Sequence, residues 1–465
     1  MNNKKLNLTT LIAFVLSSMI GSGVFSLPQN MAEVASPLAI IIGWSITGIG
    51  ILLLAISLLI LSQIRPDLDG GIYSYAKDGF GELIGFCSAW GYWLSVVIAN
   101  VSYLIIVFSA ISFFTDNSDN IIFSNGNTWQ SLIGESILLW IIHFLALKGI
   151  QTAVSINKLA TLVKLIPLIM FIILSIFSFK INIFRFNFRY DEIGIPIWQQ
   201  VKNIMLITLW VFIGIEGAIV VSARAKRRKD VGLATLVAVI STLSIYILVT
   251  ILSFGIISRS ELSEMNNPSM ASLMTNMIGT YGEIIIIVSL IFSVCSSYLN
   301  WTIMATEIPY IASLNGSFPK IFKYQNKNNT PSSSLWFTNS SIQLSLILIW
   351  LSNGNYNMLL RIASEMILVP YFIVSAFLIK ISFKHANKWF FIVGAVTNLY
   401  GLWLLYASGA INLLLSVILY MPGLFIFLYV QKKNNKKTIN LFEKISIIII
   451  IFSSIPAIYY LLSIK

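Results

Sequence analysis

Charged side chains are scarce in this chain. Asp, Glu, Lys and Arg together make up 10% of its 465 residues, while 57% are hydrophobic. An ordinary soluble domain carries about 25% charged residues, so the composition excludes a soluble protein of this length. Apolar runs of about 20 residues recur along the chain, each long enough to cross the hydrocarbon core of a membrane as a helix. The alternating strands of a membrane β-barrel are missing. The expected class is an all-α integral membrane protein.

Cysteine and histidine are almost absent, with two residues of each. Cys87 and Cys295 stand alone in or beside apolar spans, which gives neither a disulfide framework nor the spacing of metal ligands. His143 and His385 fall in different segments without ligand spacing. A membrane-embedded enzyme would need nucleophile–base pairs or metal ligands at membrane depth. The sequence therefore predicts no enzyme, no metal site and no cofactor.

Acidic side chains are also few, 18 against 30 basic ones, so the formal net charge is +12. With a cytoplasmic N-terminus, most basic residues fall in loops on the cytoplasmic side, which is the positive-inside bias. The basic balance therefore reports topology: the partner is the lipid bilayer, and no nucleic-acid partner is predicted. We expect about 12–13 transmembrane helices, placed at 7–27, 38–62, 82–114, 131–148, 157–178, 199–222, 232–257, 283–312, 335–351, 358–381, 389–407, 411–430 and 444–462.

Linkers rich in Gly, Ser or Pro are missing, so residues 1–465 are expected to form a single transmembrane domain. The first span lacks the small-residue cleavage site of a signal peptide, and we interpret it as a retained helix. The expected location is a bacterial inner membrane, crossed many times, with the N-terminus in the cytoplasm.

Glycine is concentrated in two spans. The first contains 18–25 (SMIGSGVF) and the sixth contains 210–217 (WVFIGIEG). Glycine is about 1 kcal/mol less favourable than alanine inside a helix, and a membrane helix breaks only where the freed backbone groups meet water, protein or ligand. Paired interrupted helices indicate the binding site of a transporter built from inverted repeats. Close helix packing through small residues is the alternative for either span alone. Both spans together, with a glutamate in the second, favour a site.

The two breaks predict complementary chemistry. Beyond Gly21-Ser22-Gly23 a new half-helix begins, and its unpaired N–H groups suit a carboxylate, an interaction of about 0.3–2 kcal/mol. The sixth span would leave free carbonyls near Trp210 and Ile213, which suit an ammonium group. Together they would hold the backbone of an amino acid.

Three glutamates lie at or near membrane depth, where a charge costs about 2.5–3.5 kcal/mol. Glu216 is interpreted as a gate or proton-responsive carboxylate, with a structural ion pair or a loop-end acid as the alternative. Glu307 is either a pathway residue or a packing contact on the cytoplasmic side. Glu365 follows Arg361 by four residues, which permits a plain intrahelical pair.

Aromatic residues make up 13% of the chain, and most are expected to pack or to anchor at the membrane interface. Trp210, Trp301, Tyr92 and Tyr371 are candidates for a cation-binding box, because a desolvated ring face attracts a cation by about 2 kcal/mol. Nothing in the spacing of these four residues separates the two alternatives.

Several strings of the sequence carry a family resemblance over nearly the whole chain. The chain resembles the amino acid–polyamine–organocation superfamily, in particular its basic amino acid/polyamine antiporters, and among them the arginine/ornithine antiporters. The most specific strings are 66–77 and 85–93. The full set is 19–30 (MIGSGVFSLPQN), 66–77 (PDLDGGIYSYAK), 85–93 (GFCSAWGYW), 210–217 (WVFIGIEG) and 318–320 (FPK).

The resemblance implies a LeuT-like fold: a 5+5 inverted repeat with broken helices 1 and 6, here 7–178 and 199–381, and peripheral C-terminal helices at 389–462. By resemblance, Lys164 replaces a bound sodium, for which snorkelling towards the cytoplasm is the alternative. Tyr92 and Tyr371 match aromatic gates above and below the cleft, with Glu216 as a further gate. The implied substrate-binding residues are Ile20, Ser22, Gly23, Asn100, Trp210, Ile213, Glu216 and Trp301.

The resemblance implies a secondary antiporter that exchanges cationic amino acids, arginine against ornithine first. Lysine/cadaverine, histidine/histamine and arginine/agmatine exchange stay open, as do proton-coupled import, uniport and a homodimer. The substrate is a small cationic amino acid or amine. The thirteenth span and Glu307 depart from the pattern of many relatives.

Overall fold

The computed structural model describes residues 5–189, 193–352, 356–434 and 441–463. Within these ranges the chain is helical and forms no β-strand; its extended pairing is a single bridge between Leu6 and Ala225. Eleven helices are long and apolar enough to span a membrane, or 12 spans with the bent pair at the N-terminus. This confirms an all-α multi-pass membrane protein. The eleven are α3 (Pro37–Ile64), α5 (Glu82–Thr115), α6 (Trp129–Leu147), α7 (Ile150–Ser178), α11 (Lys229–Ser253), α14 (Thr280–Leu314), α15 (Ser332–Ser352), α16 (Tyr356–Lys384), α17 (Lys388–Ser408), α18 (Ala410–Lys433) and α19 (Leu441–Ser463).

Both predicted breaks are present. α1 (Leu8–Met19) and α2 (Gly23–Val34) meet at an angle of 42°. α9 (Ile197–Phe212) ends four residues before the short helix α10 (Gly217–Val220). With 16 residues, α9 is shorter than the roughly 20 that cross a bilayer. This segment is therefore a span only as a broken helix, and it accounts for the difference between 12 and 13 spans.

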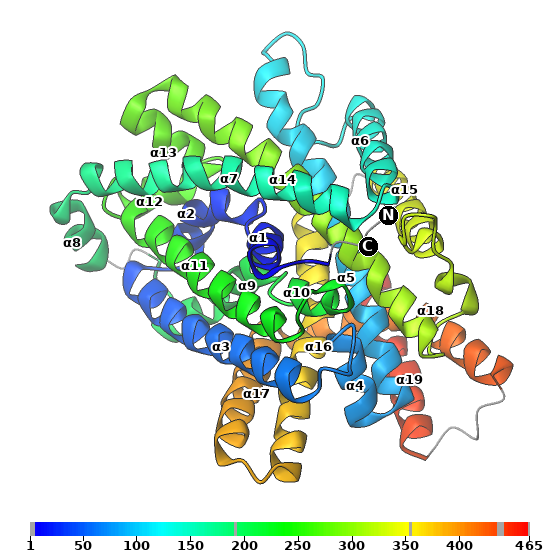
Figure 1. Cartoon of the computed structure of the whole chain (residues 1–465). Helices are drawn as coiled ribbons and strands as arrows, with labels where there is room; N and C mark the ends of the chain where they lie inside the picture. Colours follow the sequence, from blue (N-terminus) through cyan, green and yellow to red (C-terminus); the bar gives the residue numbers. More distant parts are fainter. Residues whose placement is uncertain (1–4, 190–192, 353–355, 435–440, 464–465) are drawn as a thin grey trace.

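The broken helices lie in the middle of the molecule (Figure 1). α1 runs through the centre, with α7 on one side and α11 on the other, and both helices pack directly against it. α14 packs against α5 and α7, and α3 packs against α11 and α9. α18 and α19 pack on each other at the edge. Side chains from α5, α7, α11 and α14 can therefore reach the breaks.

Four short helices lie outside the long spans, in segments that the sequence analysis placed between the spans. They are polar or too short to resemble a membrane span: α4 (Ile72–Phe80), α8 (Ile181–Arg189), α12 (Arg259–Glu264) and α13 (Ser269–Ile278). Of these, α8 falls in the segment 179–198, which is long enough for a short surface helix. α12 and α13 pack against α2, and α4 packs against α5 and α16. The expected loops on both sides of the membrane are thus partly helical.

Ion pairs fix the segment between α3 and α4. Arg65 pairs with Asp67 (2.8 Å) and Asp78 (2.6 Å), and Arg228 pairs with Asp69. The hydrogen bonds from the Arg65 guanidinium lower the pKa of Asp67 below its usual range. The segment with the most family-specific string therefore has a defined conformation, attached by Asp69 to the segment that precedes α11.

Candidate functional site

The first break leaves amide groups without partners. α1 ends at Met19, and Ile20, which is fully buried, caps it. The N–H groups of Ser22, Gly23 and Val24 have no acceptor among the described residues. They are the first donors of α2, and unpaired donors at a helix N-terminus attract anions. This end of the break is suited to a carboxylate.

The second break lies directly against the first. Gly214 has φ +110°, and a Cβ atom there would lie 2.8 Å from the carbonyl carbon of Ser18. In the same way, a Cβ atom on Gly23 would lie 2.8 Å from Val211 Cγ1 and 3.5 Å from Trp210 Cδ1. At Gly214 only glycine allows the two backbones to approach so closely, and at Gly23 the missing side chain leaves room for those of Val211 and Trp210. The glycines that suggested the breaks therefore also bring them into contact, with Trp210 half-buried beside Gly23.

The second break leaves the carbonyl of Ile213 free among the described residues. The amide of Ile213 donates to the carbonyl of Trp210 (3.3 Å), and that of Ile215 to the carbonyl of Phe212 (3.2 Å). The carbonyl of Ile213 itself has no donor within the described ranges. A free carbonyl dipole suits an ammonium group. The contacting breaks thus carry a donor end and an acceptor end.

Glu216 is fully buried beside the second break. Its carboxylate accepts from Tyr92 Oη (3.0 Å), from Tyr371 Oη (2.5 Å) and from the amide of Gly214 (3.2 Å). No lysine or arginine of the described chain pairs with it, so the structural ion pair considered above does not form. Hydrogen bonds to a carboxylate are the strong kind, and three of them hold this group in one orientation.

The two tyrosines meet at one point. The resemblance implied gates above and below the cleft, but Tyr92 on α5 and Tyr371 on α16 bind the two oxygens of the same carboxylate. α5, α10 and α16 are thereby joined through Glu216. Opening a path between these helices requires that at least one tyrosine release Glu216.

Trp301 on α14 contacts the first break, and Asn100 lies on α5, the helix that also carries Tyr92 and Tyr103. Trp301 is almost fully buried, and its Nε1 donates to the carbonyl of Ser18 (3.0 Å). Asn100 is fully buried, and neither its amide nitrogen nor its amide oxygen has a partner in the described part of the chain. Tyr103, one turn along α5, is in contact with Gly21, since a Cβ atom there would lie 3.0 Å from Tyr103 Oη. The α5 face with Tyr92, Asn100 and Tyr103 therefore lines the breaks.

Lys164 on α7 ends inside the protein, and it does not snorkel. Its Nζ lies 2.8 Å from the carbonyl of Ile20 and 2.9 Å from Ser17 Oγ, and its side chain is fully buried. The carbonyl of Ser17 (3.3 Å), Ser297 Oγ (3.3 Å) and the carbonyl of Ser293 (3.4 Å) complete the set. Three donors at most are shared among five oxygens from α1, the first break and α14.

Two serines on α14 also bind the first break, and the sequence analysis missed them. Ser293 Oγ lies within hydrogen-bonding distance of the carbonyls of Ile20 (3.1 Å) and Gly21 (3.0 Å). Ser297 Oγ lies 2.7 Å from the carbonyl of Ser17. Their spacing of four residues places both hydroxyls on one face of the helix. That spacing within an apolar span was the available signal.

Glu307 lies away from the breaks. It pairs with Arg224 (2.6 Å), whose guanidinium also donates to the carbonyl of Asn329 (3.1 Å). The pair connects α14 to the segment after α10, and both interpretations of Glu307 stay open. The suggested partner of Glu365, Arg361, lies outside the residues whose side chains the structure describes.

Comparisons with known proteins cover nearly all of the chain. A family model described as amino acid permease matches residues 6–453. A protein of Escherichia coli K12, provisionally named an arginine/ornithine antiporter, is 60% identical over 459 residues, 98% of this chain and 99% of that protein. The arginine/ornithine antiporter of Pseudomonas aeruginosa PAO1 is 38% identical over 475 residues, 98% and 97% of the two chains. The arginine/agmatine antiporter of Chlamydia caviae is 41% identical over 470 residues, 97% and 95% of the two chains.

Proposed function

The chain belongs to the amino acid permease family, and on that premise we propose that it is an antiporter of cationic amino acids that exchanges arginine for ornithine. The names of the E. coli and P. aeruginosa relatives support this pair. Arginine/agmatine exchange is the second candidate, since the C. caviae relative carries that name and its identity of 41% is similar to the 38% of the P. aeruginosa relative. Transport of this kind needs no covalent chemistry on the substrate.

The observation that carries the proposal is the contact between the two breaks. The amides of Ser22, Gly23 and Val24 can donate to an α-carboxylate. The free carbonyl of Ile213 can accept from an α-ammonium group. Every amino acid carries these two charges, whatever its side chain. The breaks are therefore suited to recognise the common part of both exchanged substrates, and we assign the buried Ile20 of the first break to the same site.

Recognition of the side chain is assigned to α5, α9 and α14. Within the described residues the amide oxygen of Asn100 has no partner, and a free amide oxygen suits the cationic end of arginine or ornithine. Trp301 offers a ring fixed by its bond to Ser18, and Trp210 a half-buried ring over Gly23. A ring face attracts a desolvated cation by about 2 kcal/mol. Together these groups favour a substrate with a second positive charge.

We assign gating to Glu216 with Tyr92 and Tyr371. The carboxylate joins the second break to α5 and α16, so its hydrogen bonds oppose separation of these helices. A substrate shifts the balance between conformations only as far as it binds them unequally. Ile213 is three residues before Glu216. A substrate ammonium group bound by the carbonyl of Ile213 can therefore change the strength of the hydrogen bonds to Glu216.

The orientation follows from the positive-inside bias. The segment after α10 carries Arg224, Lys226, Arg227, Arg228 and Lys229, and a cytoplasmic position for it places the N-terminus in the cytoplasm as well, since Leu6 pairs with Ala225. The proposed location is a bacterial inner membrane. An inverted repeat over 7–178 and 199–381 is part of the same proposal.

Exchange in proteoliposomes tests the function. Vesicles loaded with ornithine should take up labelled arginine, and empty vesicles should not. Arginine for ornithine moves no net charge, whereas arginine for doubly charged agmatine moves one, which is worth about 2.3 kcal/mol per 100 mV. An imposed potential should therefore leave arginine/ornithine exchange unchanged. Uptake into empty vesicles, or a dependence on a pH gradient, would replace the antiporter with a uniporter or a proton-coupled importer.

Glu216→Gln tests the gate. The amide keeps the size of the side chain but can accept with one oxygen only, so one tyrosine loses its acceptor. We expect slower exchange with a changed dependence on pH between pH 5 and 8, measured against the unaltered protein. Identical rates across that range would remove Glu216 from the mechanism.

A further inference from the structure

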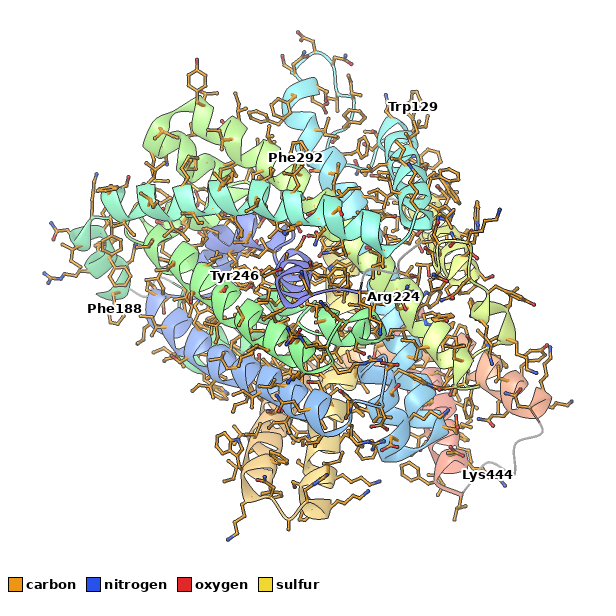
Figure 2. The ribbon with its side chains drawn as sticks, in the orientation of Figure 1. Trp129, Phe188, Arg224, Tyr246, Phe292 and Lys444 are labelled. Carbon is orange, nitrogen blue, oxygen red and sulfur yellow. The ribbon has the colours of Figure 1, made fainter. Side chains whose placement is uncertain are left out.

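Tyr246 on α11 lies where the two broken helices meet, although nothing in the sequence singled it out (Figure 2). Its side chain is fully buried. The hydroxyl lies 2.9 Å from the carbonyl oxygen of Met19 and 3.0 Å from that of Val211. Met19 is the last residue of α1, and Val211 lies in the last turn of α9. One hydroxyl therefore reaches the end of each helix just before its break.

The carbonyl of Val211 depends on this hydroxyl. In an uninterrupted helix it would accept from the amide of Ile215, but that amide donates to Phe212 (3.2 Å). Within the described residues Tyr246 is its donor. The carbonyl of Met19 also accepts from the amide of Gly21 (2.9 Å). A hydroxyl has one hydrogen, so Tyr246 serves either carbonyl or shares its hydrogen between them.

Packing fixes the position of the hydroxyl. The ring of Tyr246 lies 5.4 Å from that of Phe212 and 6.4 Å from that of Trp44, centroid to centroid. Phe212 is the last residue of α9, and Trp44 lies on α3. Because Phe212 belongs to α9 itself, the ring keeps its place beside the end of α9, and the bond from the hydroxyl to Met19 connects the end of α1 to the same point. The hydroxyl therefore contributes to the offset between the two breaks.

We propose that Tyr246 is a positioning residue that holds the two breaks in register for the substrate's α-carboxylate and α-ammonium groups. The inference rests on the proposed function. The free amides begin at Ser22, three residues after Met19, and the free carbonyl of Ile213 lies two residues after Val211. A shift of either helix end therefore moves one half of the amino-acid site relative to the other. Asn100, which is assigned to the cationic end of the side chain, lies on α5 and takes no part in this bond, whereas Trp301 donates to Ser18, the neighbour of Met19.

Loss of the Tyr246 hydroxyl should therefore weaken binding of amino acids more than binding of an amine without a carboxylate. Tyr246→Phe keeps the ring and its packing and removes only the hydroxyl. We expect the KM for arginine and for ornithine to rise about tenfold, which corresponds to about 1.4 kcal/mol. Agmatine has the cationic side chain of arginine without its carboxylate, so it needs one half of the amino-acid site only. Its inhibition constant should change by less than about threefold.

The experiment compares three proteins in the same proteoliposomes: the unaltered chain, Tyr246→Phe and Tyr420→Phe. Tyr420 on α18 supplies the control, because its buried hydroxyl has no partner in the described ranges. Binding of arginine and of agmatine is measured on the same purified samples by tryptophan fluorescence, and the agmatine value reports whether the cleft is folded. The control should match the unaltered protein.

Two results would overturn the proposal: an unchanged arginine KM, or equal losses for arginine and agmatine, since a general disturbance affects both. If the unaltered chain does not transport arginine at all, the proposed function fails by itself. The register is then tested with whichever amino acid is transported and the amine that it yields on decarboxylation.

Discussion

Replacing Lys164 by methionine should separate the geometry of the first break from the stability of the fold. Methionine has nearly the length and volume of the lysine stem, so the space in the core stays filled. The amino group gives up its two shortest contacts, to the carbonyl of Ile20 (2.8 Å) and to Ser17 Oγ (2.9 Å). Hydrogen bonds that involve a charged group contribute about 1.5–3 kcal/mol each, which suggests a loss of about 3–6 kcal/mol.

Two features offset that loss. Ser297 Oγ lies 3.2 Å from the carbonyl of Ile20 and 2.7 Å from that of Ser17, so an oxygen of the break can keep a donor when the amino group is removed. Burial of an ionised amino group also costs several kcal/mol, and this cost disappears in the variant. We therefore expect the free energy of unfolding to change by less than about 2 kcal/mol. The exchange rate should still fall at least tenfold, because Ile20 is no longer fixed to α7.

The assay measures the melting temperature of the purified variant and its arginine exchange in proteoliposomes. A change of 1 kcal/mol shifts the melting temperature by about 2–4 °C in domains of 150–250 residues, so we expect a shift below about 8 °C. Lys158→Met provides the control, since Lys158 lies exposed on the same helix. A larger shift would mean that Lys164 is mainly a structural tie, and unimpaired exchange would mean that it positions nothing.

Three further substitutions test other contacts. Gly214→Ala should abolish exchange, because its Cβ atom would meet the backbone of Ser18 at 2.8 Å, whereas Gly279→Ala, with a similar positive φ and open space, should keep it; both are measured by arginine uptake. Trp301→Phe removes the bond to Ser18 but keeps an aromatic ring, so the arginine KM should rise about tenfold, a loss of about 1.4 kcal/mol, and an unchanged KM would refute that assignment. Arg224→Gln leaves the Glu307 carboxylate buried without its partner and should destabilise the protein by up to about 3 kcal/mol, measured by thermal melts. Adding Glu307→Gln should restore part of this stability, and no recovery would refute loss of the ion pair as the cause.

The parts of the site that the sequence predicted have local signals. Both breaks follow from glycines clustered in apolar spans. In the structure Gly214 lies against the backbone of Ser18, and Gly23 lies against the side chains of Val211 and Trp210. Glu216 stood out because a carboxylate is rare at membrane depth. Lys164 was singled out by the family resemblance, and the set of oxygens around it could not be derived from its own segment.

The contacts that the sequence did not predict join distant segments. Tyr92 and Tyr371 are 124 and 155 residues from Glu216 along the chain, and their meeting depends on how α5, α10 and α16 pack. Tyr246, Ser293 and Ser297 are ordinary residues of apolar helices, and their hydroxyls matter only because carbonyls of the breaks lie opposite. These contacts depend on which helices pack against each other, and the type of a single residue does not predict that.

The bridge at Leu6 has a practical consequence for labelling this protein. The amide of Leu6 donates to the carbonyl of Arg224 (2.9 Å), and the amide of Lys226 donates to the carbonyl of Leu6 (2.7 Å). These bonds connect the start of α1 to the extended stretch beyond α10, so the outer ends of both interrupted helices are held together. A fluorescent protein fused directly before Leu6 would strain these hydrogen bonds and change the transport rate that it is meant to report. A flexible spacer before Leu6 would leave the bonds intact.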